Sequence, residues 1–96
     1  MRIFYVYIVL CSDSTYYVGI TNDLVRRILE HNSGKFQNSY TAHRRPVKLV
    51  FSEKLFDPSE AIRREKQIKR WGQAKKKALI AGDFKSLPHL SKSKSS

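Results

Sequence analysis

The sequence predicts an α+β domain in which a three-stranded antiparallel sheet is flanked by helices, in the element order β-β-α-β-α-α. Three observations lead to this class. Two apolar segments, 3–10 and 16–20, are separated by turn-forming residues, as in a β-hairpin. A third strand-like segment, 47–56, follows later in the chain. Stretches with helix-capping residues lie before and after this third segment.

The first two strands form the predicted hairpin. In segment IFYVYIVL (3–10), odd- and even-numbered residues are both largely apolar. This is typical of a strand that is covered on both faces. SDST (12–15) is turn-forming, and YYVGI (16–20) returns as the second strand. Gly19 lies inside that strand, where a glycine often marks the close approach of a ligand or another backbone.

A helix follows the hairpin. Thr21, Asn22 or Asp23 can cap its N-terminus, because each carries a side-chain oxygen that accepts from a free backbone N–H. We expect the helix to run to about Asn32 and to end at SGK (33–35).

The second half of the chain predicts one strand and two helices. FQNSYTAHRRP (36–46) has the composition of a polar loop, and VKLVFSEKLF (47–56) is the third strand. DPSE (57–60) combines a cap residue, a proline in the first turn and an acidic residue, so a helix is expected from here to Trp71. A short and very basic helix follows at 73–81.

Length and charge narrow the class of protein. Ninety-six residues allow one hydrophobic core, so we expect one domain at 1–82 and a flexible Ser- and Lys-rich tail at 83–96. The formal net charge is +11, and all of the excess lies in 35–96. A field of this sign attracts polyanions, most often nucleic acid. A solubilising surface and attraction to anionic membranes are the alternatives.

Cysteine content and hydropathy exclude several other classes. Cys11 is the single cysteine, so neither an internal disulfide nor a cysteine-based zinc site is expected. No segment approaches the ~20 apolar residues of a membrane span. These features predict a cytoplasmic, reducing setting. We also expect a monomer with no obligate protein partner and no membrane association.

Glu65 is the most informative polar position. Successive helical residues rotate by ~100°, which places Glu65 on the apolar face together with Ala61, Ile62 and Ile68. Glutamate is rarely buried unless it is paired or coordinates a metal. The alternative interpretation is a helix-surface ion pair with Lys69, four residues further on.

The helix after the hairpin carries a second pair of polar residues. Arg27 and His31 are four residues apart, so they lie on the same face. They adjoin one edge of an apolar arc formed by Leu24, Val25, Ile28 and Leu29. We expect them to point together toward the sheet, although each alone is compatible with a solvated side chain.

Tyrosines gather on the hairpin. Tyr5 and Tyr7 share one face of the first strand, and Tyr17 and Gly19 share one face of the second. Core packing accounts for any single tyrosine. Together with Arg27 on the neighbouring helix, they indicate a functional site.

These residues resemble a known family. YVY (5–7) and, ten residues after Tyr7, YVG (17–19) are similar to the two motifs of the GIY-YIG endonuclease superfamily, with Tyr5 in place of the first glycine. The continuations GITNDLVRRILEHNSGK (19–35), SEAIRREKQIKRW (59–71) and QAKKKALI (73–80) resemble its small single-domain group. The resemblance covers residues 3–81.

The resemblance implies roles for the hairpin residues. Tyr7 is then a candidate for activating the attacking water, Tyr17 for contacting the scissile phosphate, and Gly19 for keeping that surface open. A phenol with an ordinary pKa of ~10 is a poor base at neutral pH. Tyr7 would therefore need a cation that lowers its pKa, or it would only relay a proton or orient the water.

The resemblance also implies roles on the two longer helices. Arg27 matches the arginine that neutralises phosphate charge, and His31 stands where family members carry His or Tyr. Glu65 matches the single metal-binding glutamate, which implies one Mg²⁺ or Mn²⁺ ion.

Three functions are compatible with the sequence. The first is a metal-dependent endonuclease that hydrolyses DNA or RNA, with structure-selective DNA repair or processing as the implied setting. The second is a non-catalytic nucleic-acid-binding module, and the third is a protein-interaction domain with a basic surface. The basic run KRWGQAKKK (69–77) supports salt-dependent binding in either of the first two cases. The candidate nucleic-acid contacts are Gly19, Arg26, Lys69, Arg70, Lys75, Lys76 and Lys77.

Overall fold

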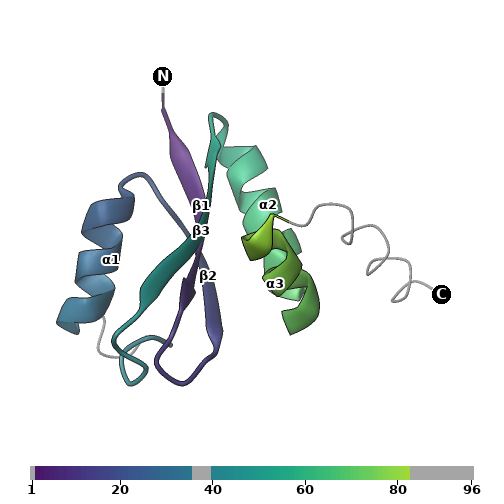
Figure 1. The fold of residues 1–96 in the computed structure, drawn as a ribbon. Helices are drawn as coiled ribbons and strands as arrows, with labels where there is room; N and C mark the ends of the chain where they lie inside the picture. Colours follow the sequence, from purple (N-terminus) through teal and green to yellow (C-terminus); the bar gives the residue numbers. More distant parts are fainter. Residues whose placement is uncertain (1, 36–39, 83–96) are drawn as a thin grey trace.

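The computed structural model describes residues 2–35 and 40–82, and within these ranges it confirms the predicted α+β fold and element order. A sheet forms the middle layer, with α1 on one face and α2 and α3 on the other (Figure 1). The elements are β1 Phe4–Leu10, β2 Tyr16–Thr21, α1 Leu24–Ser33, β3 Lys48–Leu55, α2 Pro58–Arg70 and α3 Gln73–Ala81.

The sheet is antiparallel throughout and has the strand order β2-β1-β3. β1 is therefore central, and β2 and β3 form the two edges. The register pairs Tyr7 of β1 with Gly19 of β2 on one side and with Ser52 of β3 on the other. This register brings the two tyrosine motifs to neighbouring positions.

Local capping explains where the two longer helices begin and end. Asp23 is the residue that caps α1, because its side chain accepts a hydrogen bond from the backbone N–H of Arg26. Gly34 ends α1 in the left-handed conformation, with φ 81°, which only glycine adopts without strain. The Asp57 side chain accepts from the backbone N–H of Ser59 at the start of α2.

The face covered by α2 and α3 holds an apolar core. Alternate residues of β1 and β2 point to this face, as a strand's two-residue period requires. They meet small and branched residues of the two helices, and all of these side chains are buried. The core residues are Val6, Ile8, Val18, Ala61, Ile68 and Leu79.

The face covered by α1 is built differently. Its buried residues from the sheet and the adjoining loops are Tyr7, Val9, Cys11 and Val47, packed against partly buried residues of α1. The expected apolar arc of α1 is only half covered, since Val25 is 72% exposed and Leu29 is 65% exposed. This corrects the sequence interpretation. Leu24 and Ile28 face the sheet, whereas no described element covers the next strip around the helix.

Two sequence predictions fall outside the described ranges. The expected tail, 83–96, and residues 36–39 of the expected loop belong to this part of the chain. None of the helices within 2–35 and 40–82 has the length and apolar composition needed to cross a membrane.

Candidate active site

Tyr7 is the centre of a buried polar cluster on the α1 side of the sheet. Its side chain is 0% exposed, and its hydroxyl lies 3.0 Å from Nε2 of His31 on α1. His31 is itself buried, at 4% exposed. The first-strand tyrosine and the helix histidine, predicted separately, therefore contact one another.

Gly19 makes room for Tyr7. A Cβ at Gly19 would lie 2.6 Å from the Tyr7 hydroxyl oxygen and 2.7 Å from its Cζ, which is closer than a side chain tolerates. Gly19 is also buried. This corrects the expectation that Gly19 keeps an open surface for phosphate, because the phenol of Tyr7 fills that space.

Thr41 completes the hydrogen-bonded line behind His31. Its Oγ1 lies 2.7 Å from Nδ1 of His31, and Thr41 is 1% exposed. A neutral imidazole donates from one ring nitrogen and accepts at the other. The two hydrogen bonds of His31 therefore run in one direction, either from Tyr7 to Thr41 or from Thr41 to Tyr7.

The environment favours the neutral forms of Tyr7 and His31. Burial, with a contribution from Tyr17, raises the pKa of Tyr7 to about 12, although the nearby Arg27 guanidinium acts in the opposite direction. Burial, and then the charge of Arg27, lower the pKa of His31, against the opposing effect of Glu30. Tyr7 thus remains a protonated phenol at neutral pH. A role as a base would require a lowered pKa, which is the opposite of this shift.

Arg27 connects this cluster to solvent. Its guanidinium hydrogen-bonds the Tyr7 phenol, and its side chain remains 34% exposed. Nε of Arg27 lies 3.4 Å from Oε1 of Glu30, and the other carboxylate oxygen of Glu30 lies 3.0 Å from Nζ of Lys35. Arg27 is held from two sides while part of it stays accessible.

The aromatic side chains extend the cluster outward. The ring of Tyr17 meets His31 edge-on at a centroid distance of 5.4 Å. On its other side it stacks with Tyr40, at 6.0 Å and an interplanar angle of 26°. The guanidinium of Arg44 lies 3.9 Å from the centroid of the Tyr40 ring. Tyr17 is half-buried and Tyr40 is 41% exposed, so the row leads from the buried cluster to the surface.

Sequence reasoning missed Tyr40, Thr41 and Arg44, because all three lie in the segment assigned as a polar loop. Several hydrogen bonds fix this segment. Asn32 of α1 accepts from the backbone N–H of Val47 at 2.7 Å and donates to its carbonyl at 3.1 Å. The signal in the sequence was the fifth tyrosine, separated from the other four.

The β1–β2 turn holds the same loop from the other side. Arg44 pairs with Asp13 at 2.9 Å, and the backbone N–H of Ser12 donates to the carbonyl of Arg44. The loop is therefore attached both to the end of α1 and to the hairpin, and this fixes Thr41 beside His31.

Glu65 lies on α2, across the sheet from α1. Its side chain is 18% exposed and pairs with Lys69 at 3.0 Å, so the alternative ion pair forms on a largely buried carboxylate. Ala61 and Ile68 beside it are buried as expected, whereas Ile62 is 49% exposed. The helical rotation placed Ile62 too close to the covered face, because that face is narrower than the apolar arc.

Glu65 acts electrostatically on the Tyr7 cluster. Burial is the main cause of the raised pKa of Tyr7, and the negative charge of Glu65 contributes to it. The effect of Glu65 is the smallest of those that act on the pKa of Tyr7. Within 2–35 and 40–82, no group of three or more His, Cys, Asp or Glu side chains gathers around a common point.

The basic residues predicted to contact nucleic acid differ in exposure. Arg26, Lys69, Arg70 and Lys77 are exposed, and Lys76 is half-buried. Lys75 departs from the prediction, since it is 9% exposed and its ammonium lies 4.3 Å from the ring centroid of Trp71. Lys75 faces the core side of α3 and packs against an aromatic ring instead of extending into solvent.

Comparison with known proteins identifies the family. The profile of the GIY-YIG catalytic domain matches residues 3–78. The chain belongs to the GIY-YIG family. The match spans all three strands and reaches into α3, so the family assignment applies to most of the described fold.

Relatives within the family are UPF0213 proteins. One from Syntrophus aciditrophicus is 50% identical over 76 residues, which are 79% of this chain and 87% of that protein. One from Halobacterium salinarum is 48% identical over 76 residues, with coverage of 79% and 97%. The solution NMR structure of a UPF0213 protein from Bacillus halodurans is 39% identical, with a TM-score of 0.54 and coverage of 82% and 83%. That of a protein from E. faecalis is 33% identical, with a TM-score of 0.61 and coverage of 88% of each chain.

Proposed function

We propose that this GIY-YIG protein is a divalent-metal-dependent endonuclease that hydrolyses phosphodiester bonds of DNA. One observation carries the proposal. The partly exposed Arg27 guanidinium is fastened to a buried line of hydrogen bonds through Tyr7, His31 and Thr41, and the charge of Glu65 reaches the same phenol. Buried polar networks of this kind are costly unless every member is satisfied, and they are found where geometry serves chemistry.

Arg27 is the group that would bind the scissile phosphate. A guanidinium presents a planar fork of donors that suits phosphoryl oxygens and stabilises the charge that develops on them. Tyr7 would act on this guanidinium from the buried side, which is a positioning role. Because Tyr7 is fully buried and its pKa is raised, the half-buried Tyr17 is the phenol that can meet substrate from the solvent side.

His31 supplies the acceptor that this arrangement requires. Its lowered pKa keeps the imidazole neutral at pH 7, so Nε2 can accept the phenolic hydrogen of Tyr7 while Nδ1–H donates to Thr41. In this direction of the hydrogen bonds, the oxygen of Tyr7 retains its lone pairs for the Arg27 guanidinium.

Glu65 fits a site for one divalent cation. A single carboxylate can suffice for Mg²⁺ or Mn²⁺, because such an ion commonly keeps several waters and is bound by one or two carboxylates together with substrate phosphate. Such an ion would act as a Lewis acid on the phosphate. Nζ of Lys69 lies 3.0 Å from the Glu65 carboxylate and neutralises its charge. The same carboxylate would bind both Lys69 and the metal ion.

Charge makes a nucleic acid the proposed substrate, and the resemblance to the GIY-YIG endonucleases favours DNA. The net charge of +11 and the exposed cations of α2 and α3 favour a polyanion, and phosphate contacts carry no sequence information. We therefore expect selectivity for DNA structure, as in repair or processing, with RNA as the competing substrate.

A cleavage assay tests the proposal. Plasmid, single-stranded and branched DNA and a single-stranded RNA are incubated with the protein in Mg²⁺, Mn²⁺ or EDTA. We expect metal-dependent cleavage by the wild type, and none by Glu65→Gln or by Arg27→Ala purified in the same way. Equal cleavage by wild type and variants would reveal a contaminating nuclease and contradict the site.

Binding without cleavage would favour the second function, a non-catalytic nucleic-acid-binding module. The Glu65–Lys69 pair is the observation that favours this alternative, since an ion pair is a sufficient structural reason for the carboxylate.

A further inference from the structure

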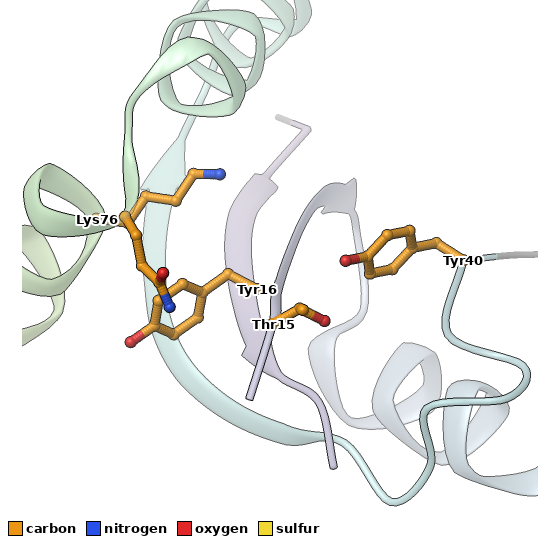
Figure 2. A pocket seen from close by; sticks show the side chains of 5 residues that line it. Thr15, Tyr16, Tyr40 and Lys76 are labelled. Carbon is orange, nitrogen blue, oxygen red and sulfur yellow. The ribbon is translucent and has the colours of Figure 1, made fainter. Parts of the chain in front are cut away.

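A polar pocket lies at the free edge of β2, outside the Tyr7 cluster. Figure 2 shows Thr15 and Tyr16 at the start of the strand, Lys76 of α3 on one side and Tyr40 of the loop on the other. Gln73 at the start of α3 completes the lining. The walls thus offer two phenol rings, a hydroxyl group, an amide and an ammonium group.

Tyr40 joins this pocket to the candidate active site. The same ring that lines the pocket stacks on Tyr17, and Tyr17 in turn meets His31. A strand edge separates the pocket from the Tyr7 cluster, and no described strand pairs with the outer side of β2. The rings of Tyr17 and Tyr40 therefore form a continuous row from His31 to the pocket.

The composition of the walls distinguishes between phosphate and base. A phosphate site usually gathers several cations or backbone N–H groups, whereas this pocket has one ammonium group among its lining residues. Aromatic rings combined with an amide that both donates and accepts are the groups that recognise an unstacked base. The lining therefore matches a nucleobase better than a phosphate.

Tyr40 is a fixed wall of the pocket, and the Tyr16 ring is the one on which a base would stack. The Tyr40 ring is already engaged, because Arg44 covers it at 3.9 Å and Tyr17 stacks with it, while Nη1 of Arg44 donates to the Tyr40 carbonyl at 2.7 Å. Asp13 fixes the same guanidinium at 2.9 Å. A preorganised aromatic side chain loses little entropy when a ligand binds.

We propose that this pocket binds the base of a nucleotide that flanks the phosphate held by Arg27. The inference rests on the proposed function and specifies its substrate class. A base reaches a pocket at a sheet edge only when it is unstacked and unpaired. The substrate would then be DNA with at least one unpaired nucleotide beside the cleaved bond.

An NMR titration in EDTA tests the pocket without any need for cleavage. The probe is a thymidine trinucleotide, and its matched control is the same trinucleotide with an abasic central residue. We expect shifts of the backbone amides of Thr15, Tyr16 and Tyr40 and of the side-chain amide of Gln73, with affinity reduced about tenfold for the abasic probe because base stacking is lost. Equal affinity for the two probes, or no shifts at these residues, would overturn the proposal.

Two variants with matched controls locate the effect. Tyr16→Leu is expected to lose the preference for the base-containing probe, whereas Phe56→Leu, which removes an exposed aromatic ring after β3, is expected to keep it. Lys76→Gln is expected to weaken binding more than Lys54→Gln, an equal change of charge on the opposite edge strand. Equal effects within each pair would also overturn the proposal.

The outcome is separable from that of the nuclease assay. Base-dependent shifts without metal-dependent cleavage would leave the pocket in place and remove the proposed enzyme activity. Cleavage without base-dependent shifts would support the enzyme activity and overturn the proposal of a base-binding pocket.

Discussion

The two faces of the sheet bury side chains of opposite chemistry from the same central strand. On the α2–α3 face, Val6 and Ile8 of β1 belong to the apolar core. On the α1 face, Tyr7 lies between them in sequence and joins a histidine and a threonine in a hydrogen-bonded line. One face excludes water and gains stability from apolar area, whereas the other buries polar groups that must all find partners.

This difference indicates that one face of the sheet mainly stabilises the fold, whereas the other face positions the polar residues of the candidate site. The apolar face can lose a side chain and still leave the polar geometry intact, as long as the protein remains folded. On the polar face, none of the buried side-chain polar atoms of the described residues lacks a hydrogen-bond partner. Variants on the two faces are therefore expected to separate stability from activity.

The largest expected effect on stability comes from the apolar face. Ile8→Ala removes a side chain that is 0% exposed and should lower the free energy of unfolding by about 2–5 kcal/mol. Urea denaturation measures this loss, and cleavage per folded molecule should remain near the wild-type rate. Val25→Ala on the exposed strip of α1 is the control and should change stability by less than about 0.5 kcal/mol. A loss in Val25→Ala as large as that in Ile8→Ala would contradict the assignment of the core.

Gly19→Ala should have the next largest effect, on activity. The added Cβ would lie 2.6 Å from the Tyr7 oxygen, so the phenol must move away from His31 and Arg27. A displacement of about 1 Å near a reacting group can lower a rate about 10²-fold. Single-turnover cleavage measures the rate, and circular dichroism checks that the variant is folded. A folded variant with the wild-type rate would show that the position of Tyr7 is unimportant.

The polar face should also make stability depend on pH. Because the pKa of His31 is lowered in the folded protein, the unfolded state binds more protons between the two pKa values, and stability rises with pH there. The contribution of neutral His31 to the free energy of unfolding is fully present above about pH 6.5. It is lost as the pH falls through the pKa of His31 in the folded protein, by up to about 1.4 kcal/mol per pH unit. Urea denaturation from about pH 5 to 7.5 measures it.

A pair of histidine variants sharpens that test. His31→Gln should flatten the dependence, whereas His43→Gln at an exposed position should retain it. Asp13 and Glu30 have lowered pKa values and titrate below this window, so they do not obscure it. An unchanged slope in His31→Gln would show that His31 is not the group responsible.

The smallest effect is expected from the exposed cations, which belong to neither buried face. Replacing Arg70 and Lys77 by Gln should weaken binding to duplex DNA equally across sequences and reduce the salt slope by about 0.9 for each lost phosphate contact. Replacing Lys48 and Lys54 of β3 removes the same charge and should leave the slope nearly unchanged. Equal slopes for both double variants would mean that the basic run has no contact of its own with DNA.

Most of the fold could be predicted from local signals. The apolar segments, the turn after β1 and the caps at Asp23 and Asp57 define elements whose bounds agree with the structure within a residue or two. The exceptions are positions at the margin of a helix face. Ile62, Val25 and Leu29 are exposed because periodicity gives the direction of a side chain but not the width of the surface that covers it.

The candidate site was predictable only in part. The tyrosines, Arg27, His31 and Glu65 follow from motif spacing, but the contacts among them depend on register and on the loop after α1. Thr41 carries no local signal, because its role arises from the loop being fastened to Asn32 and to the β1–β2 turn. The buried state of Tyr7 likewise comes from the cross-strand pairing with Gly19.

The most direct test of the division between the two faces is one variant measured in two ways. Tyr7→Phe keeps the ring and removes only the hydroxyl, and Tyr5→Phe on the same strand is the matched control. We predict that Tyr7→Phe lowers the cleavage rate about 10²-fold. It should lower the free energy of unfolding by about 1–3 kcal/mol at most, the range for leaving one buried group such as Nε2 of His31 unpaired. Tyr5→Phe should change neither by a comparable amount. A Tyr7→Phe protein that is folded and cleaves DNA at the wild-type rate would contradict the account.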